Sequence, residues 1–152
     1  MIVSVSDPKE KERISTLILS GLPEWFGLPD STQSYIQNSM SMPFWAFIEE
    51  SQPKGFIALK ETSESTAEIY VMGVLKQRHR GGIGTALWNS FLRYAREKGY
   101  EYAQVKTVQS GRYEEYDRTN LFYQHLGFRA LEVFPSLWDA WNPCQVYVKY
   151  IG

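Results

Sequence analysis

The spacing of apolar residues changes in the middle of the chain, from the pattern of a strand to that of a helix. Ala67 to Val74 is rich in β-branched and apolar residues and predicts a strand. From Gly81, apolar residues recur at helical spacing until about Gly99. A strand, a glycine-rich turn and a helix in this order predict an anion site, because unpaired N–H groups and the positive end of the macrodipole meet at a helix start. The turn carries three glycines and two arginines: Arg78, Arg80, Gly81, Gly82 and Gly84.

A pyrophosphate fits such a site, since glycines let backbone amides approach phosphate oxygens closely. The dinucleotide fingerprint G-x-G-x-x-G fails here, because Leu87 stands where the third glycine is required. The Walker phosphate loop is excluded as well, since no Gly-Lys-Ser/Thr ending is present. The glycines by themselves leave phosphate binding and an ordinary tight turn open.

The remaining pattern predicts one mixed α/β domain over residues 1–152, with about seven strands and four helices. The three central strands should form an antiparallel meander. Expected strands are Ile2–Ser6, Phe44–Glu49, Lys54–Lys60, Ala67–Val74, Tyr102–Val108, Phe128–Val133 and Cys144–Ile151. The helices are expected from the cap Asp7 to about Gly21, from Ser31 or Thr32, from Gly81 to about Gly99, and from Thr119 to Leu126.

Composition excludes several classes of partner. Sixteen basic and seventeen acidic residues leave a formal net charge of -1, so nothing favours nucleic acid or an anionic membrane. No apolar run approaches the roughly 20 residues of a membrane span. One cysteine and two histidines are too few for a disulfide framework or a zinc site, so no metal is expected. The start lacks a signal-peptide pattern, which predicts a cytoplasmic protein, and a homodimer is left open.

Two motifs resemble the Gcn5-related N-acetyltransferase (GNAT) superfamily. The pattern His79-x-x-Gly82-x-Gly84, opening a long helix, is similar to the coenzyme A pyrophosphate loop of that superfamily, Gln/Arg-x-x-Gly-x-Gly/Ala. Leu121 to Phe128 is similar to its tyrosine helix, in which an aromatic-Tyr pair precedes Gly-Phe. The motifs stand in family order with the expected strand between them. The ending from Leu137 to Lys149 is similar to uncharacterised bacterial members.

The resemblance implies a GNAT-like fold, in which about four helices flank a mixed, mostly antiparallel sheet of about seven strands. It also implies that acetyl-CoA donates an acetyl group to a primary amine of an unidentified small molecule or peptide. His79 occupies the Gln/Arg slot of the loop, and Arg78 or Arg80 could supply the charge instead. A non-catalytic acetyl-CoA sensor and a nucleotide-binding regulatory domain are the alternatives. The implied cofactor-binding residues of the loop are His79, Arg80, Gly81, Gly82, Ile83, Gly84 and Thr85.

Catalytic groups are implied by the same resemblance. Tyr123 matches a tyrosine that lies near the thioester sulfur, where its hydroxyl can protonate the departing thiolate. Glu68 precedes His79 by the interval found in the histone acetyltransferases of the superfamily, and it could accept the amine proton directly or through water. A water chain without Glu68 is the alternative. A bulge is expected to open the strand and offer backbone amides to the acetyl carbonyl at Met72, Gly73 and Val74, and an ordinary strand glycine at Gly73 is the alternative.

Asn120 lies three residues before Tyr123 and shares its helix face, where it could bond to the pantetheine arm of the coenzyme. Family members more often carry an asparagine seven residues before the tyrosine, and here that position is Tyr116.

Two aromatic loops, Pro23–Pro29 and Leu137–Pro143, could frame an acceptor pocket with Trp25 and Trp138 as its substrate-binding residues. Completion of the core is the other interpretation of these tryptophans. Carboxylates near the loops favour a cationic amine as acceptor. They are Glu24, Asp30, Glu114, Glu115, Asp117 and Asp139.

Overall fold

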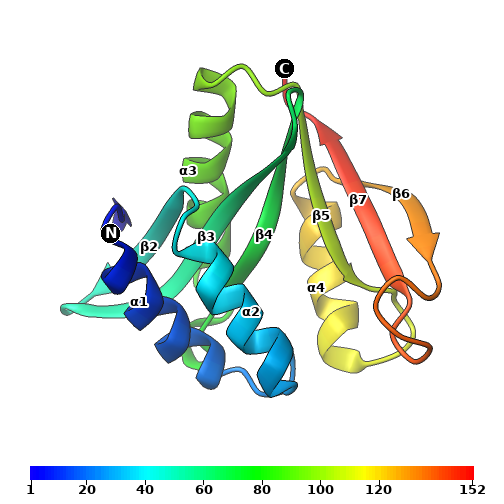
Figure 1. Cartoon of the computed structure of the whole chain (residues 1–152), viewed down its shortest axis with the longest axis horizontal. Helices are drawn as coiled ribbons and strands as arrows, with labels where there is room; N and C mark the ends of the chain where they lie inside the picture. The colour runs from blue at the N-terminus through cyan, green and yellow to red at the C-terminus, as the bar shows by residue number, and fades with distance from the viewer.

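The computed structural model describes residues 1–152. It contains one seven-stranded sheet with the strand order β1-β2-β3-β4-β5-β7-β6 (Figure 1). All neighbouring strands are antiparallel except β4 and β5, which are parallel. The predicted mixed, mostly antiparallel α/β fold is therefore confirmed. The strands are β1 (Ile2–Ser4), β2 (Phe44–Glu49), β3 (Gln52–Ser63), β4 (Thr66–Val74), β5 (Tyr102–Val108), β6 (Arg129–Phe134) and β7 (Cys144–Tyr150).

Four helices and one short 3-10 turn complete the fold. None of the helices has the length and apolar character needed to cross a bilayer. The helical segments are α1 (Pro8–Ser20), α2 (Pro29–Ser39), α3 (Ile83–Glu97), α4 (Glu114–His125) and the turn η1 (Lys76–Arg78).

Helix boundaries follow the capping signals only in part. Asp7 caps α1 as predicted, and its carboxylate accepts a hydrogen bond from the backbone N–H of Lys9. The predicted start of α2 at Ser31 or Thr32 is wrong: the helix begins at Pro29, where a missing N–H costs nothing in the first turn. The predicted start of α4 at Thr119 is also late, because the helix begins at Glu114. Its first turn is acidic rather than apolar, so apolar spacing does not mark it.

The hairpin between β2 and β3 is tighter than predicted. Glu50 and Ser51 form its two-residue turn, both with positive φ (53° and 65°), as the primed hairpin turns require. β3 consequently begins at Gln52 rather than Lys54, and it continues to Ser63.

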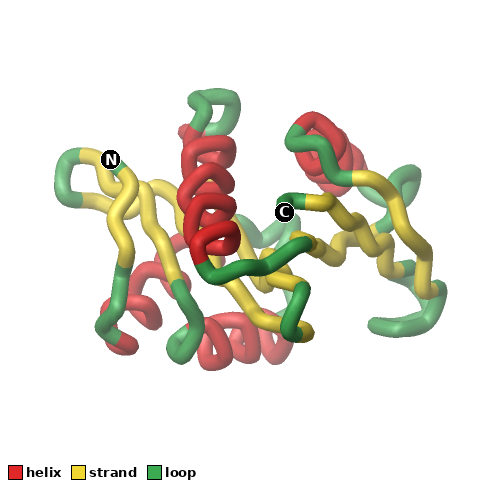
Figure 2. The backbone as a smooth tube through the Cα atoms, turned by 90° about the horizontal axis from the view of Figure 1, so that it is seen from above, coloured by secondary structure: helices red, strands yellow, loops and turns green.

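Two apolar clusters fill the two sides of the sheet, and Figure 2 shows helices on both faces. α1 and α2 cover one face with a cluster that includes Ile18 and Phe56. α3 packs on the other face through Leu87 and Phe91, in a cluster that also includes Tyr123 of α4. Because strand side chains alternate between faces, the central strands β2, β3 and β4 supply residues to both clusters.

β4 and β5 pair only at their beginnings and then separate, as Figure 1 shows. The paired residues run from Thr66 opposite Tyr102 to Ile69 opposite Val105. Directly after this point β4 contains a bulge, since Ile69 pairs with Leu59 and Val71 with Ala58 of β3. Tyr70 is thus the unpaired extra residue, and a bulge bends its strand. The separation leaves the β5 side of the second half of β4 without a partner strand.

Asn120 ties α4 to the sheet from a fully buried position. Its side-chain amide donates to the carbonyl oxygens of Val108 (2.9 Å) and Tyr116 (2.7 Å). Its oxygen accepts a hydrogen bond of 2.6 Å from the hydroxyl of Tyr147 on β7. One side chain thereby joins α4 to β5 and β7.

Replacement of Asn120 by alanine should lower the free energy of unfolding by about 1–3 kcal/mol, because the Val108 carbonyl and the Tyr147 hydroxyl lose their buried partner. Urea unfolding followed by tryptophan fluorescence measures this. Asn89→Ala on the exposed face of α3 is the control and should change the free energy by less than about 0.5 kcal/mol. Equal effects of the two substitutions would contradict the structural role of Asn120.

Candidate functional site

The start of α3 presents unpaired backbone donors to open space. The first helical hydrogen bond is donated by Ala86 to the carbonyl of Gly82, and no side chain caps the helix. The N–H groups of Gly82, Ile83, Gly84 and Thr85 therefore have no acceptor within the chain. Gly82 has a φ of 80°, and a Cβ placed on it would meet nothing within 4 Å. Such a set of donors at the positive end of a helix suits an anionic oxygen group.

Gly84 owes its place to helix packing. A Cβ at Gly84 would lie 3.0 Å from Cζ of Phe122, a residue of α4. The missing side chain thus lets α4 approach the first turn of α3. The predicted glycine loop and the predicted tyrosine helix are in contact at this point.

The side chains of the loop before α3 have different partners. Nε2 of His79 lies 2.7 Å from the carbonyl oxygen of Val74, so that this nitrogen must donate its hydrogen, and the ring is turned back toward β4. Arg78 is held by Glu49 in an ion pair of 3.0 Å. Arg80 is exposed and has no ion-pair partner, so of the two candidate arginines it is the one whose charge is uncompensated.

The edge of β4 next to the separation carries further free donors. The N–H of Leu75 donates to the carbonyl of Lys54 on β3. Because peptide groups alternate in direction along a strand, the N–H groups of Val74 and Met72 point the other way, toward the β5 side. The bulge predicted at Met72, Gly73 and Val74 lies instead at Tyr70, because Gly73 and its neighbours pair regularly with β3.

Gly73 has a packing role that the predicted bulge does not require. A Cβ there would lie 3.0 Å from side-chain carbons of both Ile18 and Leu22. The glycine therefore lets α1 pack directly on β4.

Tyr123 faces the apolar layer between α4 and the sheet. Its ring lies edge-on to Phe128 at 6.0 Å and tilted against Tyr147 at 6.2 Å. Burial raises the pKa of Tyr123 above its usual range, with smaller contributions from Tyr116 and Tyr35. A raised pKa keeps the hydroxyl protonated at every pH near neutrality, as a proton donor requires. No hydrogen bond occupies this hydroxyl.

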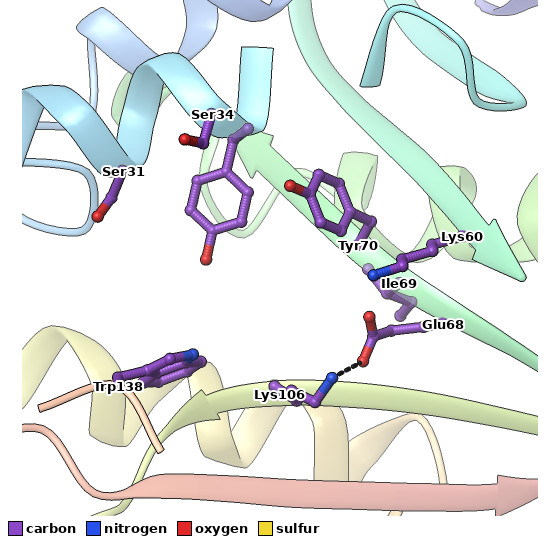
Figure 3. Close-up of a pocket in the computed structure, with 9 residues that line it drawn as sticks. Ser31, Ser34, Lys60, Glu68, Ile69, Tyr70, Lys106 and Trp138 are labelled. Atoms are coloured by element: carbon purple, nitrogen blue, oxygen red, sulfur yellow. Dashed lines mark ion pairs between the residues drawn. The ribbon is translucent and has the colours of Figure 1, made fainter. Parts of the chain in front are cut away.

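Glu68 lines a cavity of about 310 Å³ on the α2 face of the sheet, beside the point where β4 and β5 separate. Its Oε1 accepts a hydrogen bond from Nε2 of Gln104 (3.0 Å) and pairs with Nζ of Lys106 (2.8 Å), the contact dashed in Figure 3. Its Oε2 has no partner and is the oxygen available to a ligand. The other residues around the cavity come from α2, β3, β4 and the β6–β7 loop: Ser31, Ser34, Tyr35, Lys60, Ile69, Tyr70 and Trp138.

The two tryptophans predicted to frame an acceptor pocket do not meet. Trp138 lines the cavity together with Glu68 (Figure 3). Trp25 lies elsewhere: its indole N–H donates to Oγ1 of Thr119 (3.1 Å), and its carbonyl accepts a hydrogen bond from the Tyr116 hydroxyl (2.7 Å). The ring of Trp25 also meets that of His79 edge-on at 5.8 Å. This tryptophan therefore fastens the α1–α2 loop to α4 and to the loop before α3.

The carboxylates predicted to attract a cationic amine do not line the cavity. Glu24 pairs with Lys76, Glu114 pairs with Arg118, and Asp117 accepts from the N–H of Gly111. Asp139 holds its own loop through Asn142, which with the neighbouring amides lowers its pKa. The cavity instead contains two lysines that sequence reasoning missed, Lys60 and Lys106. Alternation along the two strands places both on the face of Glu68, but the strand register was needed to bring them together.

Asn120 uses its whole amide for the hydrogen bonds to Val108, Tyr116 and Tyr147. This leaves no donor free for a pantetheine arm and favours a structural role. No group of three or more His, Cys, Asp or Glu side chains is arranged to hold a metal ion.

Comparison of the sequence with protein families identifies one family that matches most of the chain. The model of the acetyltransferase (GNAT) family matches residues 12–128. Among curated proteins, none matches the sequence significantly.

Solved structures share the fold at low sequence identity. An aminoglycoside 6'-N-acetyltransferase complexed with coenzyme A is 20% identical, with a TM-score of 0.78 over 100% of this chain and 97% of that one. The ribosomal-protein-S18-alanine N-acetyltransferase from Escherichia coli is 14% identical, with a TM-score of 0.79 over 100% and 95%. An IAA acetyltransferase from Bacillus cereus is 18% identical, with a TM-score of 0.75 over 99% and 98%. Because these three proteins are named for different acceptors, the shared fold does not identify the acceptor of this chain.

Gly82→Ala should weaken the binding of coenzyme A by about tenfold, because a methyl group and a strained φ would disturb the donors at the start of α3. Gly99→Ala is a matched control at the other end of the same helix, since Gly99 also has a positive φ (86°) and open space around its Cα. Both variants should lose about 1 kcal/mol or more of stability. Isothermal titration with coenzyme A distinguishes the two variants. Equal affinities of the Gly82 and Gly99 variants would contradict an anion site at the start of α3.

Proposed function

Because the chain belongs to the acetyltransferase (GNAT) family, we propose that it transfers an acetyl group from acetyl-CoA to a primary amine of a small molecule or peptide. The observation that carries this proposal is the set of four unpaired N–H groups from Gly82 to Thr85 in front of open space. A pyrophosphate matches that set in charge and in hydrogen bonding. Arg80 adds an uncompensated positive charge beside it.

The edge of β4 supports the next part of the proposal. The N–H groups of Met72 and Val74 point toward the β5 side, where no strand accepts them. Such a preformed donor can stabilise the negative charge that develops on a carbonyl oxygen during acyl transfer. Two to four kcal/mol of barrier reduction, roughly, is typical of one oxyanion donor.

Proton transfers would be divided between the two faces of the sheet. The amine nitrogen forms a bond to the acetyl carbon, and the carbon–sulfur bond breaks. The amine proton passes to Oε2 of Glu68, directly or through water, and the hydroxyl of Tyr123 protonates the departing sulfur. Burial supports the second role, because it raises the pKa of Tyr123 and so retains its proton.

Binding and turnover test this proposal separately. Isothermal titration against acetyl-CoA, coenzyme A and ATP should show binding of the first two, with ATP much weaker. Thiol release from acetyl-CoA should then depend on an added amine, taken from a panel of polyamines, aminoglycosides, amino acids and peptides. Binding without amine-dependent release would favour an acetyl-CoA sensor. Preference for ATP would instead favour a nucleotide-binding regulatory domain.

Tyr123→Phe should lower the turnover number by about tenfold or more and leave the affinity for coenzyme A nearly unchanged, because only a proton donor is removed. The proton-donating form persists at alkaline pH, since the pKa of Tyr123 is raised, so its contribution should not be lost below about pH 10. Tyr102→Phe, an exposed tyrosine at the start of β5, is the control. Unchanged turnover in Tyr123→Phe would exclude the proposed donor.

A further inference from the structure

The cavity beside Glu68 contains more positive than negative charge. Its lining includes the ammonium groups of Lys60 and Lys106 and one carboxylate, that of Glu68. Lys106 is paired with Glu68 at 2.8 Å. Lys60 has no carboxylate within ion-pair distance, and its Nζ stands 5.7 Å from the centre of the Tyr70 ring. The positive charge of Lys60, an exposed residue on the cavity wall, is therefore left without a counter-ion within the protein.

From this arrangement we propose that the acceptor is an amino carboxylate, whose carboxylate binds Lys60 while its amine meets Oε2 of Glu68. The idea rests on the proposed function for the transfer step but not for the binding of the ligand. An α-amino acid is the simplest molecule that carries both groups. Its carboxylate would supply the missing counter-ion, and charge-assisted hydrogen bonds of this type are stronger than neutral ones.

Strand register places the two anchoring residues side by side. Lys60 of β3 is directly opposite Glu68 of β4, and Glu68 is directly opposite Gln104 of β5. Directly opposite side chains have Cβ atoms about 4.5–5.5 Å apart and project from the same face. The charged ends of the two side chains are beyond ion-pair distance of each other, which leaves room for a ligand that carries both an amine and a carboxylate between them.

Further groups around the cavity offer polar and aromatic surface to the rest of the ligand. Ser31 and Ser34 project from α2 across the cavity from Lys60 and Glu68 (Figure 3), and their hydroxyls can hydrogen-bond a polar group in the rest of the ligand. Tyr70 and Trp138 add aromatic surface for a side chain of the ligand. The volume of about 310 Å³ is small for a binding site and fits a single amino acid.

The same charges oppose a polycation. A polyamine or an aminoglycoside would add positive charge to a cavity that already has a surplus, and only Oε2 of Glu68 would be free to compensate it. The charges around the cavity thus favour an amino carboxylate over a polycation, a distinction that the shared fold does not make.

The test measures binding to the protein saturated with coenzyme A. The probes are the twenty amino acids, the amides of those that bind, spermidine and kanamycin. At least one amino acid should bind about tenfold or more tightly than its own amide, because only the amino acid can pair with Lys60. Spermidine and kanamycin should bind more weakly than that amino acid. Equal binding of acid and amide, tighter binding of a polycation, or binding of no amino acid would overturn the proposal.

Lys60→Met removes the charge and keeps an unbranched stem over Tyr70, so it should abolish the preference for the acid over the amide. Lys98→Met is the matched control, because Lys98 stands 5.4 Å over the ring of Tyr94 and does not line the cavity. Thermal melting checks that both variants are folded. A preference that survives in Lys60→Met would overturn the role of this lysine.

Acetylation of the same probes distinguishes the two proposals. If an amino acid binds preferentially but is not acetylated, the carboxylate site is supported and the proposed transfer reaction is contradicted. If amides and amino acids are acetylated equally, the proposed transfer reaction is supported and the carboxylate site is contradicted.

Discussion

Separation of β4 from β5 after four residue pairs is the constraint on which the candidate site depends. The bulge at Tyr70 lies directly beyond the last pair and bends β4 away from its neighbour. Two consequences follow at one place. The N–H groups of Met72 and Val74 lose a neighbouring strand, and a cavity forms at Glu68 on the α2 face. A sheet paired over its full length would offer neither feature.

The two faces of the sheet supply different chemistry to this place. On the side of α3 and α4, unpaired backbone donors at the start of α3 face open space, and the protonated hydroxyl of Tyr123 belongs to a side chain in the apolar cluster. On the side of α2, charged side chains surround the cavity, and Glu68 is held by Gln104 and Lys106. In the proposed transfer reaction, the acetyl donor and the amine would approach from opposite faces and meet where β4 and β5 separate. Hydrogen bonds between Trp25, in the α1–α2 loop, and α4 link the parts of the chain on either side of this separation.

Sequence reasoning succeeded where the signal is local. The order of strands and helices and the cap at Asp7 follow from spacing and from capping preferences within a few residues. It was less accurate where local signals compete. Pro29 begins α2 ahead of two good capping residues, and the acidic first turn of α4 carries no apolar period. The bulge position was also missed, because register depends on the partner strand and not on β4 alone.

The amino-acid sequence by itself determined the fold class, the glycine turn before α3 and the motif that contains Tyr123, because each is encoded in neighbouring residues. Only the tertiary structure decided which side chains share the cavity with Glu68. Lys60 and Lys106 lie on different strands and meet Glu68 through the register of β3 and β5 against β4. It also decided that Trp25 and Asn120 are occupied by other partners. Such contacts depend on long-range pairing and on packing between faces, which residue spacing along one segment does not contain.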